Sequence, residues 1–407
     1  MDFNDTPAEA AFRAEVRRWL AANAPPADAL GYDAAALPAA RAWQARKAAA
    51  GYAAITWPVA LGGRGGRTIE EVIYRQEESR YGFPGSHFAI GLGICLPTLM
   101  SYATPEQVAR HVRPALYGEE IWCQLFSEPA AGSDVAGIRT RAQRDGEDWV
   151  VNGQKCWTSG AEYADFGLLL ARTDAGVPKH RGLTVFFVDM KSPGIRVRPI
   201  RQSDGGSEFS EVFFTDLHIP DCQRLGGVGE GWKVVLTTLM HERNLVGGNK
   251  MWPTPAEVLD MTSRLTLDRA PASRDLRVRA RIADWEVDHR GLVYLYYRAL
   301  TSLGRGQAPG PEQALHKLVS CSQGQEIACF LMDLMGPAGA MAPAALGSAW
   351  ASVEKTWWWS SAQRIAGGTD EILKNIIAER VLGLPADVRV DKDVPFSELA
   401  EIQRRTA

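Results

Sequence analysis

The sequence contains neither a C-x-x-C pair nor an apolar run long enough to span a bilayer. Its six cysteines are Cys95, Cys123, Cys156, Cys222, Cys321 and Cys329. Without paired spacing they indicate neither a zinc site nor a disulfide framework, which fits reduced thiols. Residues 1–5 are acidic and lack the apolar region of a secretory signal. We therefore expect a cytoplasmic protein of bacterial type without a metal site.

An excess of charge of either sign is also missing, because 45 Lys and Arg residues stand against 48 Asp and Glu residues. The net charge of -3 favours neither a nucleic acid nor an anionic membrane as partner. No G-x-G-x-x-G and no alternation of strands with helices occurs, which argues against a Rossmann fold. The glycine-rich residues 61–66 lack the lysine of a phosphate-binding P-loop.

The N-terminal third has the pattern of helices. Thr6-Pro7-Ala8-Glu9 and Thr104-Pro105-Glu106-Gln107 are capping boxes with proline at the first helical position. The first is followed by apolar residues on one helical face, namely Phe12, Val16, Trp19 and Leu20. A further helix is expected over residues 39–50. A chain of 407 residues holds roughly two or three domains, and residues 1–120 are predicted to form an α-helical one.

The middle of the chain changes to short strand-like runs separated by Gly, Pro and Asp turns. The runs are residues 167–172, 183–189, 195–200 and 211–216. They predict an antiparallel β-domain over residues 121–230. Helical patterns return from Gly231, so residues 231–385 are expected to form an α-helical bundle, followed by a polar tail at 386–407. The predicted fold class is therefore α+β and multidomain.

Residues 122–160 combine a loop of small residues with a predicted β-hairpin. The loop, Ala130-Ala131-Gly132-Ser133-Asp134, lets the backbone approach a ligand closely. The hairpin is predicted from Asn152-Gly153 between two strand-like runs. Hydroxyl groups and a tryptophan suited to a flat aromatic ligand lie at Ser127, Trp157, Thr158 and Ser159. The same pattern also fits an ordinary hairpin with strand aromatics.

A carboxylate stands out in the helical pattern that begins at Gly231. On a 3.6-residue period, Glu242 shares one stripe with Val235, Leu239 and Val246. A carboxyl group in such surroundings has a raised pKa, which suits a general base. The alternative is a structural glutamate paired with Arg243 or another cation.

Two long motifs resemble the signatures of the acyl-CoA dehydrogenase family. The first runs from Trp122 through Ser127-Glu128-Pro129 to Asp134, and the second is Asn152-Gly153-Gln154-Lys155-Cys156-Trp157-Thr158-Ser159-Gly160. The similarity extends over residues 5–385 and is strongest to the bacterial branch, whose substrates include acyl-CoA esters of steroid side chains. It implies an N-terminal α-domain, a middle antiparallel β-domain and a C-terminal α-bundle. It also implies FAD as cofactor, electron-transfer flavoprotein as electron acceptor, and a homotetramer or dimer of dimers.

The resemblance assigns the catalytic base to Glu242. Most family members carry this glutamate late in the chain, where the present sequence has Gly367 within Ile365-Ala366-Gly367-Gly368-Thr369. The isovaleryl and long-chain branches carry it instead in an earlier Glu-Arg pair, which Glu242-Arg243 matches. By analogy, Glu242 removes the α-proton and a hydride passes from the β-carbon to flavin N5, giving a 2,3-enoyl-CoA. The backbone N–H of Gly367 is expected to donate to the thioester carbonyl. Gly367 and Gly368 precede Thr369, which is expected to be the N-cap of a helix over residues 370–382.

The remaining site residues also come from the resemblance. Contacts to FAD are expected from Gln124, Ser127, Trp157, Thr158, Gly336, Thr369 and Glu371, and contacts to the substrate from Ser133, Met240 and Arg243. The sequence departs from the family in having Asp333 where a glutamine is usual near Gly336. No R-x-x-x-F-G element occurs, and Arg274, Arg277 or Arg279 are its possible replacements. The run Trp357-Trp358-Trp359 is expected in a buried helix–helix seam, with a wall of the substrate pocket as the other interpretation.

Two other functions are compatible with this sequence. One is a catalytically silent partner subunit of a heteromeric dehydrogenase, against which the presence of Glu242 argues. The other is a flavin monooxygenase on the same fold, which needs no base for an α-proton and binds reduced flavin loosely.

Overall fold

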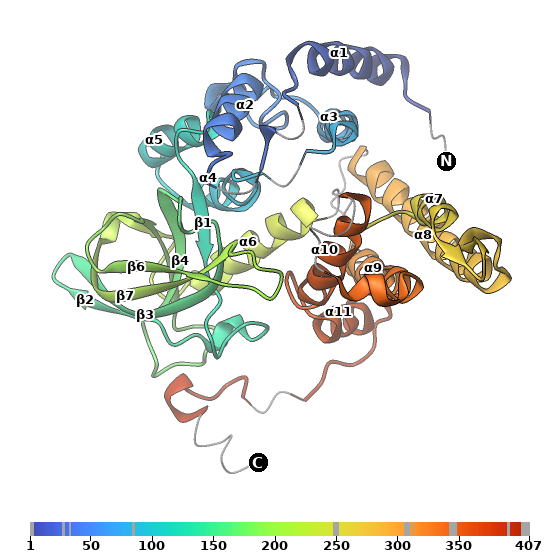
Figure 1. The fold of residues 1–407 in the computed structure, drawn as a ribbon. Helices are drawn as coiled ribbons and strands as arrows, with labels where there is room; N and C mark the ends of the chain where they lie inside the picture. Colours follow the sequence, from blue (N-terminus) through green and yellow to red (C-terminus); the bar gives the residue numbers. More distant parts are fainter. Residues whose placement is uncertain are drawn as a thin grey trace. The chain divides into compact units, whose positions relative to one another are not determined.

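The computed structural model describes nine segments of the chain. They are residues 4–26, 29–31, 34–83, 86–246, 252–304, 310–311, 313–341, 348–388 and 391–399. Contacts divide the chain into two units (Figure 1). The first comprises Asp5–Leu245 and the C-terminal residues from Asp387, and the second contains Val246–Ala386.

The first unit begins with the predicted α-helices. They are α1 (Pro7–Asn23), α2 (Leu37–Ala49), α3 (Thr68–Glu78), α4 (Leu96–Tyr102) and α5 (Pro105–Leu116). Both capping boxes are confirmed, because the hydroxyls of Thr6 and Thr104 accept from the backbone three residues on, and the side chains of Glu9 and Gln107 accept in return. A π-helical turn, Gly91–Cys95, leads directly into α4.

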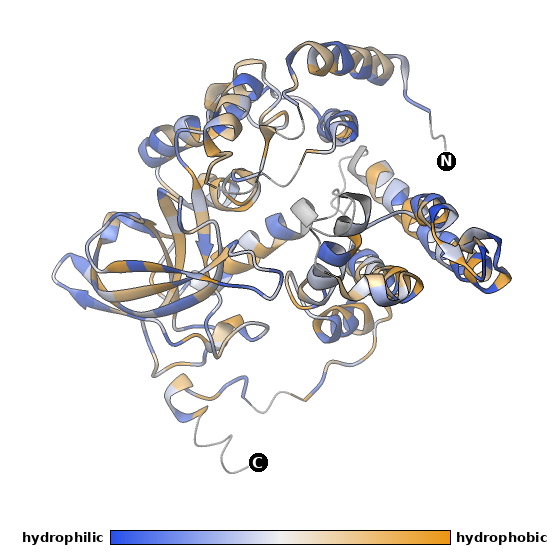
Figure 2. Ribbon diagram, in the orientation of Figure 1, coloured by the Kyte–Doolittle hydropathy of each residue, from blue (hydrophilic) through white to orange (hydrophobic). Residues whose placement is uncertain are grey.

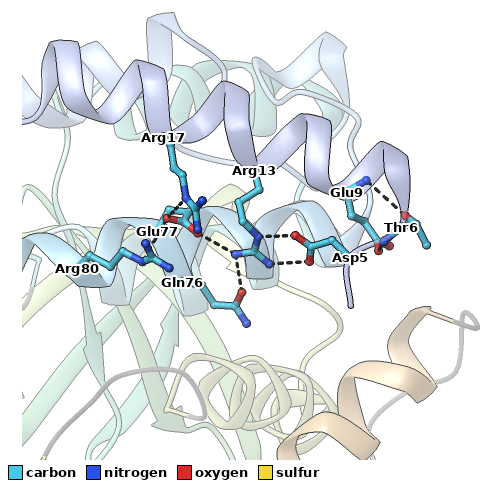
Figure 3. Close-up of polar contacts among 8 residues, drawn as sticks. All are labelled: Asp5, Thr6, Glu9, Arg13, Arg17, Gln76, Glu77 and Arg80. Carbon is cyan, nitrogen blue, oxygen red and sulfur yellow. Dashed lines mark hydrogen bonds and ion pairs between the residues drawn. The ribbon is translucent and has the colours of Figure 1, made fainter. Parts of the chain in front are cut away.

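A buried carboxylate joins α1 to α3. Glu77 is 1% exposed and accepts hydrogen bonds from Arg13 Nη1 and Arg17 Nε, both at 2.9 Å (Figure 3). Arg80 Nε lies 3.2 Å from the same carboxylate. Burial opposes ionisation of Glu77, but the hydrogen bonds from Arg17 and Arg13 outweigh it and hold its pKa below the ordinary value. The ionised carboxylate therefore keeps three arginines together at this helix contact.

The strands of the first unit form one eight-stranded sheet. They are β1 (Trp122–Leu125), β2 (Arg141–Asp145), β3 (Asp148–Ser159), β4 (Phe166–Arg172), β5 (Leu183–Asp189), β6 (Ile195–Ile200), β7 (Phe209–Pro220) and β8 (Arg224–Leu225). Their order is β6-β7-β3-β2-β4-β5-β8, and β1 pairs with β4. Most neighbours are antiparallel, as predicted, whereas β1 and β4 run parallel, and so do β2 and β4 at their single pairing.

Both faces of the sheet are covered, which explains why β4 is apolar at successive positions. Leu169 packs with Phe186 in one core cluster, while Leu168 and Leu170 pack in another. Figure 2 shows the hydrophobic stretches that run through these strands. The second cluster also contains Val234 and Val235 of α6 (Gly231–Val246), so α6 lies against the sheet.

The predicted hairpin at Asn152-Gly153 is wrong, because both residues lie inside the continuous strand β3. The Asn152 side chain exchanges two 3.0 Å hydrogen bonds with Asp216 across a bulge in the β3–β7 pairing. A Cβ atom at position 153 would lie 2.5 Å from Thr140 Oγ1, so glycine is needed for close strand packing rather than for a turn. The turn that joins β2 to β3 instead contains Gly146, with a left-handed φ of 59°.

The second unit is helical. It contains α7 (Pro255–Arg264), the short strands β9 (Thr266–Leu267) and β10 (Ala270–Pro271), α8 (Leu276–Gly304), α9 (Gln313–Leu334), α10 (Ser348–Gln363) and α11 (Asp370–Ile376). The predicted helix over residues 370–382 is α11 followed by a π-helical turn, Ile377–Val381. Trp357 and Trp358 are 36% and 37% exposed, so the predicted buried seam is wrong for these two side chains. Within the segments described, no helix is long and apolar enough to cross a membrane.

The carboxylate at the α1–α3 contact gives a stability prediction. Glu77→Gln should lower the free energy of unfolding at pH 7 by about 2 kcal/mol, because it removes the buried anion that three arginines share, of which Arg13 keeps Asp5 as a second partner. The pKa of Glu77 is lowered by folding, so its contribution is present above the ordinary value of 4.5 and is lost as the pH falls through the lowered value. Urea unfolding at pH 7 and pH 4 should therefore show a smaller difference from the parent at the lower pH.

Glu71→Gln on the same helix is the matched control, because Glu71 is paired with Arg75 at the surface. It should change the unfolding free energy by less than about 1 kcal/mol. Equal effects of the two substitutions would contradict a special role for the buried carboxylate.

Candidate active site

The two signature motifs lie against each other in the structure. The backbone N–H of Cys156 donates to the carbonyl oxygen of Ser127 at 2.9 Å. Lys155 Nζ donates to the carbonyl oxygen of Phe126 at 2.9 Å and to Glu128 Oε1 at 2.8 Å. The segment after β1 and the end of β3 are therefore joined by main-chain and side-chain bonds together.

Glu128 and Lys155 form a buried ion pair that the sequence analysis did not assign. Lys155 is 0% exposed and Glu128 7%. Glu128 also accepts from the backbone N–H groups of Arg139, at 2.6 Å, and Thr140, at 2.9 Å. Burial lowers the pKa of Lys155 below its ordinary value, and the Glu128 carboxylate opposes that shift by stabilising the charged ammonium group. One signal in the sequence was the position of Lys155, which shares the alternating register of the buried Trp149 and Val151.

Trp157 has an unusual backbone. Its φ of 58° lies in the left-handed region, at the point where the β3–β7 register shifts between Lys155 and Thr158. Such a conformation costs on the order of 1–3 kcal/mol in a residue with a side chain, and strain of this kind is common at ligand sites. The indole is 57% exposed and contacts only the edge of Phe209 among described rings, with centroids 5.9 Å apart.

A cavity of about 540 Å³ lies beside the exposed indole. It is lined by Pro129, Cys156, Trp157, Arg198, Pro199, Ile200 and Glu211. Next to Trp157, the buried hydroxyl oxygen of Thr158 has no hydrogen-bond partner among the described residues. An open aromatic face beside a cavity fits a flavin ring, which is flat. The buried Thr158 does not line this cavity, so its contact with the ring remains a prediction from the resemblance.

The small-residue loop of the first signature is ordered. Ser133 and Asp134 are exposed, and Asp134 precedes a 3₁₀ turn, Val135–Gly137. The Glu128 carboxylate closes the loop by accepting from the backbone at residues 139 and 140, where the loop ends. The predicted substrate-binding hydroxyl of Ser133 is thus presented to solvent on a fixed backbone.

The predicted base lies on α6, which is fixed to α4. The hydroxyl oxygens of Thr98 and Thr238 are 3.1 Å apart, and those of Tyr102 and Thr237 are 2.9 Å apart. Glu242 follows one turn after Thr238 and is half-buried.

Glu242 acts electrostatically on the buried thiol of Cys95. The Cys95 pKa is raised well above its ordinary value, first by burial and then by Cys123 and Glu242. Met240, a predicted substrate contact, is 53% exposed on the same helix, and the side chain of Arg243 lies outside the described residues.

The other predicted site residues belong to the second unit. Gly367 and Gly368 have left-handed φ values of 63° and 99°, and the hydroxyl of Thr369 accepts from the backbone N–H of Ile372 at 3.3 Å. Thr369 is thereby confirmed as the N-cap of α11. Lys317 Nζ donates to the carbonyl oxygens of residues 366 and 368, both at 2.5 Å, and so fixes this turn. Gly336 and Glu371 are exposed.

The first unit combines an α-helical region with a β-sheet that has a cavity beside an exposed indole, and the second unit is helical. This architecture fits a flavin-dependent oxidoreductase. Three family models match successive parts of the chain. They are the N-terminal domain (residues 6–119), the middle domain (residues 123–217) and the C-terminal domain (residues 229–382) of acyl-CoA dehydrogenase.

Curated relatives match nearly the whole chain. Acyl-CoA dehydrogenase IpdE1 of Mycobacterium tuberculosis is 35% identical over 93% of this chain and 98% of its own length. IpdE1 of Mycolicibacterium smegmatis is 36% identical with the same coverage. This chain belongs to the acyl-CoA dehydrogenase family. It is an oxidoreductase with FAD as cofactor, and acyl-CoA thioesters of lipid metabolism are the substrates of its family.

Solved structures agree with this assignment. The Tcur3481-Tcur3483 steroid ACAD matches with a TM-score of 0.80 and 26% identity, over 95% of this chain and all of the other. The ChsE4-ChsE5 complex of Mycobacterium tuberculosis matches with a TM-score of 0.80 and 27% identity, again over 95% and 100% of the two chains. Both names indicate assemblies of two different chains.

The buried pair in the signatures gives a second prediction. Lys155→Met should lower the free energy of unfolding by about 3–5 kcal/mol, because the Glu128 carboxylate is left buried without its cation. Adding Glu128→Gln should restore part of that loss, since the buried charge is then removed. Denaturant unfolding of both single variants and the double variant measures the coupling. A double variant whose loss equals the sum of the two single losses would rule out an energetic pair.

The exposed indole gives a third prediction. Trp157→Ala should weaken retention of FAD, since it removes an aromatic surface whose burial is worth roughly 1–3 kcal/mol. That range corresponds to an increase of about 5- to 150-fold in the dissociation constant of FAD, measured by titrating the apoprotein. Trp157→Phe keeps an aromatic surface and should retain most of the affinity. Unchanged affinity in the alanine variant would make Trp157 an ordinary strand residue.

Proposed function

We propose that this chain oxidises an acyl-CoA thioester to the 2,3-enoyl-CoA, with Glu242 as the base that removes the α-proton. The observation that carries the proposal is the position of this carboxylate. It lies half-buried on a helix that the Thr98–Thr238 contact fixes to α4, one turn after Thr238. At the position where most of the family carries the base, this chain has Gly367. Glu242 is thus the carboxylate available for this step.

The surroundings of α6 support a role in proton transfer. Its inner face packs into an apolar cluster with Cys95, Leu96 and Leu99, and Leu239 of α6 packs against the same cluster. Glu242 follows Leu239 on this helix and is itself half-buried. Electrostatic interactions are stronger where water is excluded. A carboxylate held there can accept a proton from carbon only if the negative charge that develops on the thioester is stabilised at the same time.

The second unit is proposed to supply that stabilisation. Gly367 and Gly368 hold left-handed conformations ahead of the helix capped by Thr369, where backbone N–H groups are not shielded by side chains. We assign the N–H of Gly367 to the thioester carbonyl. Lys317 keeps the turn in place by binding its carbonyl oxygens, so those N–H groups need no rearrangement during the reaction.

The cofactor is assigned to the cavity beside Trp157. Trp157 is proposed to cover one face of the flavin ring, and the hydroxyls of Ser127 and Thr158 and the side chain of Gln124 to bind its polar edge. FAD, when bound, accepts the hydride that leaves the β-carbon of the substrate. Gly336, Thr369 and Glu371 are proposed as further contacts to FAD, and Ser133, Met240 and Arg243 as contacts to the acyl-CoA.

The similar solved structures suggest a class of substrate and a form of assembly. The matched steroid ACAD suggests a bulky acyl group as substrate, and the two-chain complexes suggest a partner chain, with a homotetramer as the alternative. Electron-transfer flavoprotein is the proposed electron acceptor. A silent partner subunit is the second candidate function, favoured by those same two-chain complexes and opposed by the placement of Glu242.

A fourth prediction tests the base. Glu242→Gln preserves volume but removes the proton acceptor, and general-base catalysis contributes roughly 10²–10⁴-fold. Mixed anaerobically with an acyl-CoA that bleaches the parent flavin, the variant should reduce its flavin at least about 100-fold more slowly. Its FAD content should match that of the parent, because a neutral amide costs less to bury than an unpaired carboxylate.

Glu119→Gln serves as the control, because Glu119 is exposed and lies outside the proposed site. It should reduce its flavin at the parent rate. A Glu242→Gln variant that also reduces its flavin at the parent rate would refute the assignment of the base. A parent protein that holds FAD but is bleached by no member of a panel of short, branched, long and steroid acyl-CoAs would favour the silent subunit.

A further inference from the structure

The C-terminal residues 391–399 dock onto the turn between β4 and β5. The backbone N–H groups of Phe396 and Ser397 donate to the carbonyl oxygens of Val177 and Ala175, both at 2.9 Å. Pro395 forms an isolated β-bridge with Pro178. The segment therefore adds main-chain pairing to this turn, although it follows the whole helical unit in the sequence (Figure 1).

Phe396 covers a buried guanidinium. Arg172 is 5% exposed and has no carboxylate within ion-pair distance in the described part of the chain. It donates instead to the carbonyl oxygens of Ala136 at 2.6 Å, Ile138 at 3.1 Å and Lys179 at 3.1 Å. The ring of Phe396 lies over its central carbon at 3.4 Å. A cation without a carboxylate is thus stabilised by three carbonyl dipoles and the face of one aromatic ring.

Lys179 makes a second connection to the same segment. It is 8% exposed, and its Nζ lies 2.9 Å from Asp134 Oδ2 and 2.5 Å from Asp391 Oδ2. Both carboxylates stabilise the charged lysine, so removal of either one leaves a mostly buried ammonium with a single partner. Asp391 thereby supports the contact that Lys179 makes to Asp134.

Both connections end on the loop that contains Ser133. Arg172 holds this loop at residues 136 and 138, and Lys179 holds it at Asp134, the neighbour of Ser133. The Glu128 carboxylate ties residues 139 and 140, and none of these bonds involves the Ser133 side chain itself. Ser133 is therefore exposed on a backbone that Arg172, Lys179 and Glu128 hold in place.

We propose that residues 391–399 act as a strap that positions the Ser133 loop for the CoA part of the substrate, with Phe396 and Asp391 as positioning residues that work through Arg172 and Lys179. The link to CoA depends on the proposed function, whereas the ordering of the loop does not. With the strap detached, the buried cations lose their cover, and the loop samples other conformations. If the competent conformation is then held about one tenth of the time, the apparent KM for acyl-CoA rises about tenfold. The chemical step at saturation is unaffected.

The test compares four full-length holoenzymes with the parent. Phe396→Ala and Asp391→Asn weaken the strap. Phe396→Tyr keeps the aromatic face, and Asp393→Asn makes the same chemical change at an exposed position two residues from Asp391. Hydrogen exchange of peptides covering residues 129–138 reports the order of the loop without any substrate. Flavin content and thermal midpoint establish that each variant is folded.

We expect exchange in residues 129–138 to accelerate at least about fivefold in the two weakening variants and to stay at the parent rate in the two controls. With an acyl-CoA that the parent oxidises, KM should rise about tenfold in the weakening variants while kcat changes by less than about twofold. Phe396→Tyr should keep the parent KM, because it keeps an aromatic ring over Arg172. A general loss of stability would not predict this difference between the two substitutions of Phe396.

Each of the other outcomes contradicts one part of the proposal. Unchanged exchange in both weakening variants refutes the strap. Faster exchange with an unchanged KM refutes its connection to substrate binding. A parent that oxidises no acyl-CoA contradicts the proposed function, and the exchange comparison still decides whether the segment orders the loop.

Discussion

The ion pair between Glu128 and Lys155 is the interaction on which the proposed site depends. It joins two segments that lie 27 residues apart, and it does so at a point with almost no access to water. Ion pairs of this kind contribute little net free energy, because desolvation cancels most of the Coulomb attraction. Such a pair favours one strand register over the others, because a shifted strand would bury each charge without its partner. The pair thereby favours the register in which the backbone N–H of Cys156 reaches the carbonyl oxygen of Ser127.

Three buried charges are stabilised in three different ways in the first unit. Lys155 has a carboxylate and a carbonyl oxygen, Glu77 has three arginines, and Arg172 has carbonyl dipoles and an aromatic ring. In each case a charged side chain connects segments distant in the sequence, where an apolar residue would only fill space. Directional bonds to buried charges therefore hold the first unit together in addition to its apolar core. The strained backbone of Trp157 can persist only in such surroundings.

Local rules predicted the features that depend on neighbouring residues. The capping boxes at Thr6 and Thr104 and the cap at Thr369 follow from side chains within one turn of the backbone they bind. The α–β–α order followed from hydrophobic periodicity and from the family resemblance. The hairpin predicted at Asn152-Gly153 was wrong, because a β-bulge and a hairpin turn favour the same types of residue. In this structure, glycine is needed at position 153 because Thr140 approaches its backbone closely. The contact of Lys179 with Asp391 spans 212 residues, and no sequence pattern encodes such a partner.

The docked C-terminal segment also has a consequence for the thermodynamics of the helical unit. The chain leaves the first unit at Leu245 and rejoins it from Asp387, so Val246–Ala386 is an insertion with both ends tethered. If these helices unfold while residues 391–399 stay docked, the unfolded chain is a loop held at both ends. Such a loop has fewer conformations than a chain with one free end. For a covalent closure of about 100 residues the chain-entropy model gives about 4.7 kcal/mol, and a tether of weak bonds supplies at most the free energy of its own docking. Weakening the contacts of residues 391–399 with the β4–β5 turn should thus lower the stability of helices that lie far from this segment in the sequence, such as α9, through the entropy of their unfolded state alone.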